Sequence, residues 1–135
     1  MPARFLGAML CVLGLVVLAA CGGVTDPSDN RSTPFSGTLQ VGGPANTHEF
    51  SSSKNGEFEI RLTALSPNRN VFIGIGFGQM FGGACQQIFG YVNNFAQVDR
   101  SALAGPINKA AYCAYVFDSG ALTETSTYTI TVSHP

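Results

Sequence analysis

Charged side chains are scarce in this sequence, and positive charge is nowhere concentrated. Asp, Glu, Lys and Arg make up 11% of its 135 residues, and the formal net charge is −1. No basic patch predicts nucleic-acid binding, and no polybasic stretch predicts attraction to an anionic membrane surface. Beyond the first twenty residues, no segment is long and apolar enough to span a bilayer. The composition therefore argues against a nucleic-acid-binding protein and against a polytopic one.

Side chains suited to catalysis are also few. The only histidines are His48 and His134. His134 is next to last, where chain ends fray, and His48 precedes Glu49 on a short predicted strand, where neighbours point to opposite faces. No Gly-x-Ser-x-Gly motif occurs. The glycine-rich run 74–78 lacks the third glycine of a dinucleotide-binding loop, since Phe81 stands there. We therefore expect no enzymatic activity and no cofactor.

Two groups of acidic residues need separate consideration. Glu57 and Glu59 would share one strand face, which could serve acid–base chemistry or hold a cation. Arg61 continues the row, so a solvated, partly neutralised face is the favoured interpretation. Asp118 and Ser119 could belong to a calcium loop, but Asp-Ser-Gly is a common turn. We expect no metal site.

The first twenty residues have the three parts of a secretory signal. Arg4 supplies positive charge, residues 5–18 form the apolar region, and Ala19 and Ala20 provide the small residues of a cleavage site. The apolar region is shorter than the roughly 20 residues that a membrane span requires. We expect residues 1–20 to be a signal peptide, and the mature chain to lie outside the cytoplasm.

The run Leu18-Ala19-Ala20-Cys21 resembles the lipobox of bacterial lipoproteins. The resemblance implies that the Cys21 thiol carries a diacylglycerol lipid, that the chain is cut before it, and that the new amino group is often acylated. Two or three acyl chains would anchor the protein stably. Gly22, not aspartate, follows, which favours the outer membrane if the host is Gram-negative. The alternative is a plain secreted protein with a chance cysteine at this position.

Of four cysteines, Cys11 would leave with the signal peptide and Cys21 would carry the lipid. Cys85 and Cys113 remain, and a pair of cysteines in an oxidising compartment favours a disulfide bond. The alternative is two buried free thiols. A zinc site is not expected, because two cysteines without neighbouring histidines do not supply four ligands.

The mature chain divides into a tether and one domain. Residues 21–34 contain two prolines and one apolar side chain of any size, so we expect a lipid-anchored flexible tether. Residues 35–135 are long enough for a single domain with its own core.

Apolar and polar residues alternate along several short segments of this domain, which predicts half-buried antiparallel strands. The clearest is 57–65, where Phe58, Ile60 and Leu62 share one face. The predicted strands cover residues 35–41, 47–53, 57–65, 71–77, 111–118 and 125–133, with one more near 87–92. We therefore expect an all-β fold, an antiparallel β-sandwich.

Between residues 78 and 109 the alternation is lost, and we expect long loops around the one strand. Long loops are often functional, and amides mixed with aromatics are typical of a surface for a carbohydrate or a peptide. The candidate binding surface consists of Phe72, Phe81, Phe89, Tyr91 and Phe95. The other interpretation is that these rings belong to the core and that Cys85 fastens the loop.

Most of the domain resembles the bacterial pre-peptidase C-terminal type of domain. The segments that carry the resemblance are 35–39, 48–50, 56–65, 71–78, 112–118 and 128–132. It implies a small β-sandwich of jelly-roll-like topology with a binding or accessory role. Such domains are appended to secreted enzymes or stand alone in lipoproteins, and we expect the second case, because the sequence shows no attached peptidase.

Three functions remain open at this point. The favoured one is a lipid-anchored binding or accessory module of the cell envelope, whose partner is a polysaccharide or a protein. The others are an envelope hydrolase with a scattered active site, and a structural or inhibitory module that acts through the 78–109 loop. An exposed aromatic row favours binding. A deep pocket with clustered carboxylates or a histidine favours an enzyme.

Overall fold

The computed structural model describes residues 27–135. The predicted signal peptide, Cys21 and the first part of the predicted tether lie outside the described residues. A short 3-10 helix, Pro27–Asp29, precedes eight strands. They are β1 (Arg31–Leu39), β2 (Asn46–Ser52), β3 (Gly56–Ser66), β4 (Ile73–Phe81), β5 (Ala84–Ala96), β6 (Arg100–Ile107), β7 (Ala110–Phe117) and β8 (Ser126–His134).

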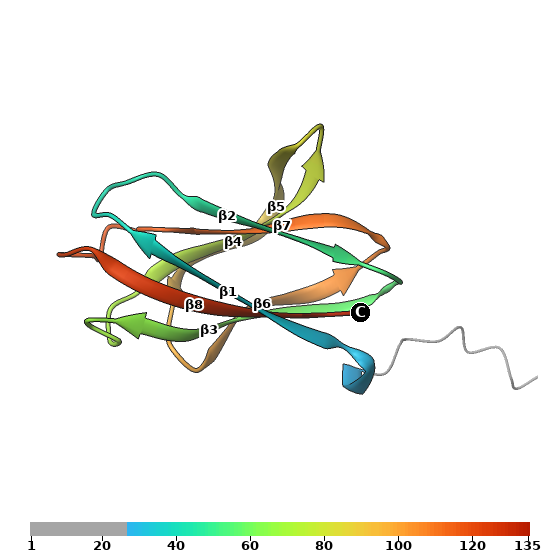
Figure 1. Cartoon of the computed structure of the whole chain (residues 1–135), viewed down its shortest axis with the longest axis horizontal. Coiled ribbons are helices and arrows are strands. Elements are labelled where there is room, and N and C mark those ends of the chain that lie inside the picture. The colour runs from blue at the N-terminus through green and yellow to red at the C-terminus, as the bar shows by residue number, and fades with distance from the viewer. Residues whose placement is uncertain (1–26) are drawn as a thin grey trace, which may run out of the picture.

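The strands form two four-stranded sheets. Their orders are β1-β8-β3-β6 and β2-β7-β4-β5, and every pair of named strands is antiparallel. Figure 1 shows the two sheets as facing layers. Each strand that contributes to the core turns alternate residues toward the other sheet, because side chains in a strand point alternately to its two faces. The predicted all-β antiparallel sandwich is confirmed.

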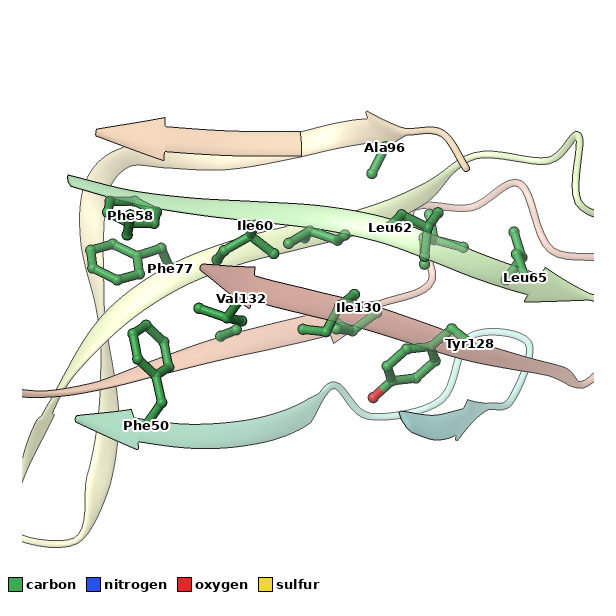
Figure 2. Close-up of a cluster of buried hydrophobic side chains, with 14 of the residues drawn as sticks. Phe50, Phe58, Ile60, Leu62, Leu65, Phe77, Ala96, Tyr128, Ile130 and Val132 are labelled. Atoms are coloured by element: carbon green, nitrogen blue, oxygen red, sulfur yellow. The ribbon is translucent and has the colours of Figure 1, made fainter. Parts of the chain in front are cut away.

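In the core between the sheets, phenylalanine rings gather at one end, aliphatic side chains lie in the middle, and Tyr128 and Leu65 lie at the other end (Figure 2). Phe58 of β3 and Phe77 of β4 stack across the two sheets, with ring centroids 4.0 Å apart. Ile60, Leu62 and Ile130 continue the core and have no exposed surface. Within the described residues, the stretch 39–132 contains every buried member of this core cluster.

The first strand begins earlier than the alternation predicts. β1 starts at Arg31, which pairs with His134, so residues 31–34 belong to the sandwich and not to a tether. Pro34 is tolerated because β1 lies at the edge of its sheet, where a missing N–H need not interrupt a ladder on both sides. The predicted tether boundary at residue 34 is corrected accordingly.

The long loops expected over 78–109 are largely strands. β4 continues to Phe81, and β5 follows after Gly82 and Gly83, whose φ angles of 56° and 79° suit a two-residue hairpin turn. β6 then pairs with β3 at the edge of the other sheet, a position that admits Pro106. The alternation is hidden in the sequence because β5 has no consistently buried face and β6 consists mainly of small residues.

Candidate functional site

The outer face of β4 carries no side chains over three successive positions, Gly74, Gly76 and Gly78. These glycines are nevertheless buried, because aromatic side chains of β7 lie over the first two. A Cβ atom at Gly74 would clash with the ring of Phe117, and one at Gly76 with the ring of Tyr115. The two rings stack on each other with centroids 6.0 Å apart.

At Gly78 the backbone of β5, and not an aromatic ring, covers β4. A Cβ atom there would clash with the backbone oxygen of Gln86 and would lie 3.0 Å from the Cys113 sulfur. The neighbouring strand β5 therefore folds over β4 at this point. Cys85 of β5 is joined to Cys113 of β7 by a disulfide bond that passes over β4, with Cα atoms 5.9 Å apart. The predicted disulfide is confirmed, and the alternative of two free thiols is wrong.

Beyond this crossing, the ends of β4 and β5 form a hairpin that stands away from the sandwich (Figure 1). We call residues 79–90 the β4–β5 hairpin. Nearly all of its residues are exposed or half-buried, including Phe81, which is 52% exposed. The disulfide adds a covalent link to the sheet, beside the contact that Ile88 of the hairpin makes with the core.

A bulge in β5 decides which aromatic rings face solvent. The ladder passes from Gly76↔Val92 to Gly78↔Gln87, so five steps along β5 match two along β4 and leave three extra residues. Gly90, with φ at 87°, lies within this bulge, where a residue with a side chain would be strained. On one side of it Phe89 is 99% exposed.

Tyr91, on the other side of Gly90, packs against the core. Its ring lies 5.7 Å from that of Phe58 and 5.6 Å from that of Phe77. Its hydroxyl approaches Gly105 of β6, where a Cβ atom would lie 2.6 Å from it. Tyr91 is therefore half-buried and packed against the core, whereas Phe89 is fully exposed.

The other four predicted aromatics fall into two groups. Phe81 and Phe89 lie on the β4–β5 hairpin, whereas Phe72 and Phe95 meet edge-to-face, 5.9 Å apart, beside the Ile73↔Ala96 pair at the far end of these strands. Phe95 is 71% exposed and Phe72 is half-buried. These four members of the candidate binding surface thus lie in two separate places.

The hairpin belongs to a charge-free segment. No Asp, Glu, Lys or Arg occurs between Arg69 and Asp99, a run of 29 residues. These two flanking residues form an ion pair with each other at 2.8 Å. The exposed polar side chains of the hairpin are the amides of Gln86 and Gln87. The surface therefore offers apolar rings and neutral hydrogen-bonding groups.

Both histidines contribute to packing between strands. His48 contacts the Tyr128 hydroxyl at 2.7 Å and stacks on Phe35 with ring centroids 5.1 Å apart. His134 is 3% exposed, and its ring lies 5.0 Å from that of Phe50. The expectation that His134 frays is wrong, because β8 extends to it and pairs it with β1. Burial lowers the pKa of both imidazoles.

The acidic candidates form local interactions. Glu59 pairs with Arg61 at 2.8 Å on the outer face of β3, as the neutralised-row interpretation predicts. The Asp118 carboxylate accepts backbone N–H groups of Gly42, Gly120 and Leu122 at 2.8–3.2 Å, and these bonds lower its pKa. Its oxygens thus order a turn. Within residues 27–135, no three His, Cys, Asp or Glu side chains are grouped to hold a metal ion.

Two hollows lie elsewhere on the surface of the domain. One of about 490 Å³ lies over β1, β3 and β8. Its lining contains no carboxylate and no histidine, and consists of Ser36, Gly37, Thr38, Ala64, Leu65, Ser66, Thr127, Tyr128 and Thr129. Another, of about 400 Å³, is lined by Arg69, Asn70, Gln97 and Val98. Neither has the clustered carboxylates or the histidine expected of a hydrolase.

No known protein family matches the chain, and no curated protein sequence is similar to it. In the part of the chain that the structure describes, no helix is long and apolar enough to cross a membrane.

Replacing Cys85 and Cys113 together by alanine should release the β4–β5 hairpin. The chain-entropy model gives a loss of about 3.5 kcal/mol in the free energy of unfolding for a separation of 28 residues. We expect hydrogen exchange to show that residues 84–88 lose their protection, while the amides of β3 lose no more protection than the fall in the global free energy of unfolding requires. Unchanged protection in the hairpin would show that the bridge does not hold it.

Because burial disfavours the protonated form of both histidines, we expect acid to destabilise the fold. Because burial lowers the pKa of His48 and His134 below 6.5, the unfolded chain binds more protons than the folded chain as the pH falls through this value. The free energy of unfolding in urea should therefore be lower below about pH 6.5 than at neutral pH, and should keep falling until the pH passes the folded-state pKa values. His48→Gln should make the decline shallower. A stability that stays constant or rises toward pH 5 would contradict the prediction.

Proposed function

We propose that this chain is a lipid-anchored, non-enzymatic binding module of the bacterial cell envelope, and that the β4–β5 hairpin is its contact surface. The observation that carries the proposal is the position of Phe89, which is 99% exposed on a braced, charge-free hairpin. Burying a phenylalanine side chain contributes about 1.5–3 kcal/mol, so a partner that covers Phe89 gains this amount. Interface centres are likewise enriched in aromatic residues and depleted of charge.

Two features order the backbone of the hairpin in the absence of a partner. The Cys85–Cys113 bridge and the Gly82-Gly83 turn fix its backbone before any partner arrives. A contact surface that is already ordered loses less conformational entropy on association. This preorganisation supports a role in recognition.

Location supports an envelope partner in two ways. A disulfide suits an oxidising compartment outside the cytoplasm, in agreement with the predicted signal peptide. If Cys21 carries lipid, the described chain begins six residues later, at most about 20 Å from the anchor. In Figure 1 that end and the β4–β5 hairpin lie on opposite sides of the sandwich. The hairpin would then face away from the anchoring membrane.

The resemblance to pre-peptidase C-terminal domains, which implies a binding or accessory role, favours the same function and stays a prediction.

The proposal predicts that residues 22–135, immobilised without the lipid, retain a set of components from an extract of the host envelope. Phe81→Ser combined with Phe89→Ser should reduce this retention at least tenfold. Its free energy of unfolding should stay within about 0.5 kcal/mol of the parent, because neither ring is buried. Retention is measured by mass spectrometry and glycan analysis of the eluate.

Val41→Ser is the matched control, since Val41 is 53% exposed, as Phe81 is 52% exposed, and it lies outside the hairpin. The control should retain the same components as the parent. Equal losses in both variants, or retention that survives in the double variant, would refute the hairpin as the contact surface.

A further inference from the structure

At one edge of the sandwich, β1 of one sheet lies beside β2 of the other, and side chains connect the two strands. β1 pairs with β8 and β2 pairs with β7, so no backbone ladder joins β1 to β2. Asn46 and His48 of β2 make the contacts instead, since both point inward from the strand. We call the residues that meet here the edge cluster: Phe35, Thr38, Asn46, His48 and Tyr128.

The hydrogen bonds of the edge cluster have a definite direction. The Asn46 Nδ2 group donates to the backbone oxygen of Thr38 at 2.8 Å. Burial raises the pKa of Tyr128, and a hydrogen bond from the Asn46 side chain to its oxygen opposes this rise. The Tyr128 oxygen lies 2.7 Å from His48 Nε2, the nitrogen that can accept its proton. We therefore assign Tyr128 as the donor and the uncharged His48 ring as the acceptor.

Protonation of His48 takes this acceptor away. A charged imidazole carries a hydrogen on both ring nitrogens, so Nε2 would point an N–H at the Tyr128 oxygen. Figure 2 shows the Tyr128 hydroxyl pointing from β8 toward β2, the strand that carries Phe50. Tyr128 is 2% exposed, so water reaches its unpaired proton only when the edge loosens. A buried donor without a partner destabilises the closed state.

No negative charge compensates a proton on His48. Its ring stacks on Phe35 of β1, and Tyr128 of β8 is the one titratable group that it contacts among the described residues. Glu49, the next residue of β2, is exposed on the opposite face of the strand. Burial lowers the pKa of His48, in agreement with this uncharged surrounding.

The second histidine lies farther along the same edge but has a mixed surrounding. His134 of β8 contacts Thr33 of β1 and packs on Phe50 of β2. The positive charge of Arg31 disfavours its protonation, whereas a hydrogen bond to the Pro135 oxygen favours it. These opposed groups leave His48 as the group whose protonation directly breaks a contact between the sheets.

We propose that His48 makes the β1–β2 edge of the sandwich sensitive to acid. The proton that it takes up leaves the Tyr128 hydroxyl without an acceptor, so β1 and β2 separate more often while the centre of the sandwich stays closed. The effect is confined to this edge and adds to the lower stability of the whole fold in acid.

The direction of the pH dependence follows from the two states of the edge. In the closed state burial holds the pKa of His48 below its ordinary value, and in the open state the ring is hydrated and regains that value. The open edge therefore binds the proton more readily than the closed one. Opening should increase as the pH falls through about 6.5 and level off only below the pKa of the closed state.

Hydrogen exchange measured by NMR on residues 22–135, which hold all eight strands, tests the proposal. Protection factors, corrected for the intrinsic exchange rate at each pH, are compared at about pH 7.5 and about pH 5, on either side of the ordinary histidine pKa. In acid the amides of β1 and β2 should lose at least about fivefold more protection than those of β4. Equal losses in all three strands, or no loss, would refute the proposal.

His48→Gln tests whether His48 is the responsible group. The glutamine carbonyl accepts the Tyr128 proton at any pH, so the difference between the edge strands and β4 should disappear. Glu49→Gln is the matched control, because it removes a titratable group from the neighbouring, outward-facing position and should respond as the parent does. A difference that persists in His48→Gln, or that disappears in Glu49→Gln, rules out the assigned role of His48.

Tyr128→Phe tests the direction of the hydrogen bond. If Tyr128 donates to Nε2, its hydroxyl stabilises the uncharged ring alone, and its removal should raise the pKa of His48, read from the NMR signals of the imidazole. A lower pKa would show that His48 is the donor and would overturn the proposal. Should Tyr128→Phe fail to fold, the comparison of His48→Gln with Glu49→Gln decides the question.

Discussion

The bare outer face of β4 is the constraint on which the rest of this structure depends. Because Gly74 and Gly76 have no side chains, the rings of β7 can lie directly over the strand. Because Gly78 has none, the backbone of β5 can cross β4 closely enough for Cys85 to reach Cys113. A single Cβ atom at Gly78 would clash with that backbone. The course of the β4–β5 hairpin therefore follows from the absence of one methyl group.

The side chains that hold the two sheets together are different from the exposed side chains of the candidate site. The core holds the two sheets together through the stacked rings of Phe58 and Phe77 and the aliphatic residues behind them. The hairpin contacts this core through Ile88 and is attached to β7 by the disulfide bond, whereas its exposed residues can change with little cost to folding. The exposed Phe89 makes no contribution to this core, so the proposed contact surface can be altered without disturbing the packing between the sheets.

The sequence predicts the strands that have one face buried in the core and the other face exposed to solvent. Residues 57–65 alternate because β3 has the core on one side and solvent on the other, and the disulfide follows from the number of cysteines. β5 was not predictable in the same way, since part of it leaves the sandwich. Phe89 is exposed and Tyr91 packs against the core because β5 has a bulge around Gly90. A bulge is a property of the pairing between two strands, and the local sequence pattern does not show it.

Photo-cross-linking in intact cells tests most directly whether the hairpin is the contact surface. The photoreactive residue p-benzoylphenylalanine would replace Phe89 in one full-length chain and Val41 in another, and both chains would be irradiated in the envelope of the producing cell. The account predicts a covalent adduct of defined mass from position 89 and none from position 41. Adducts from position 41 alone, or the same adducts from both positions, would contradict it.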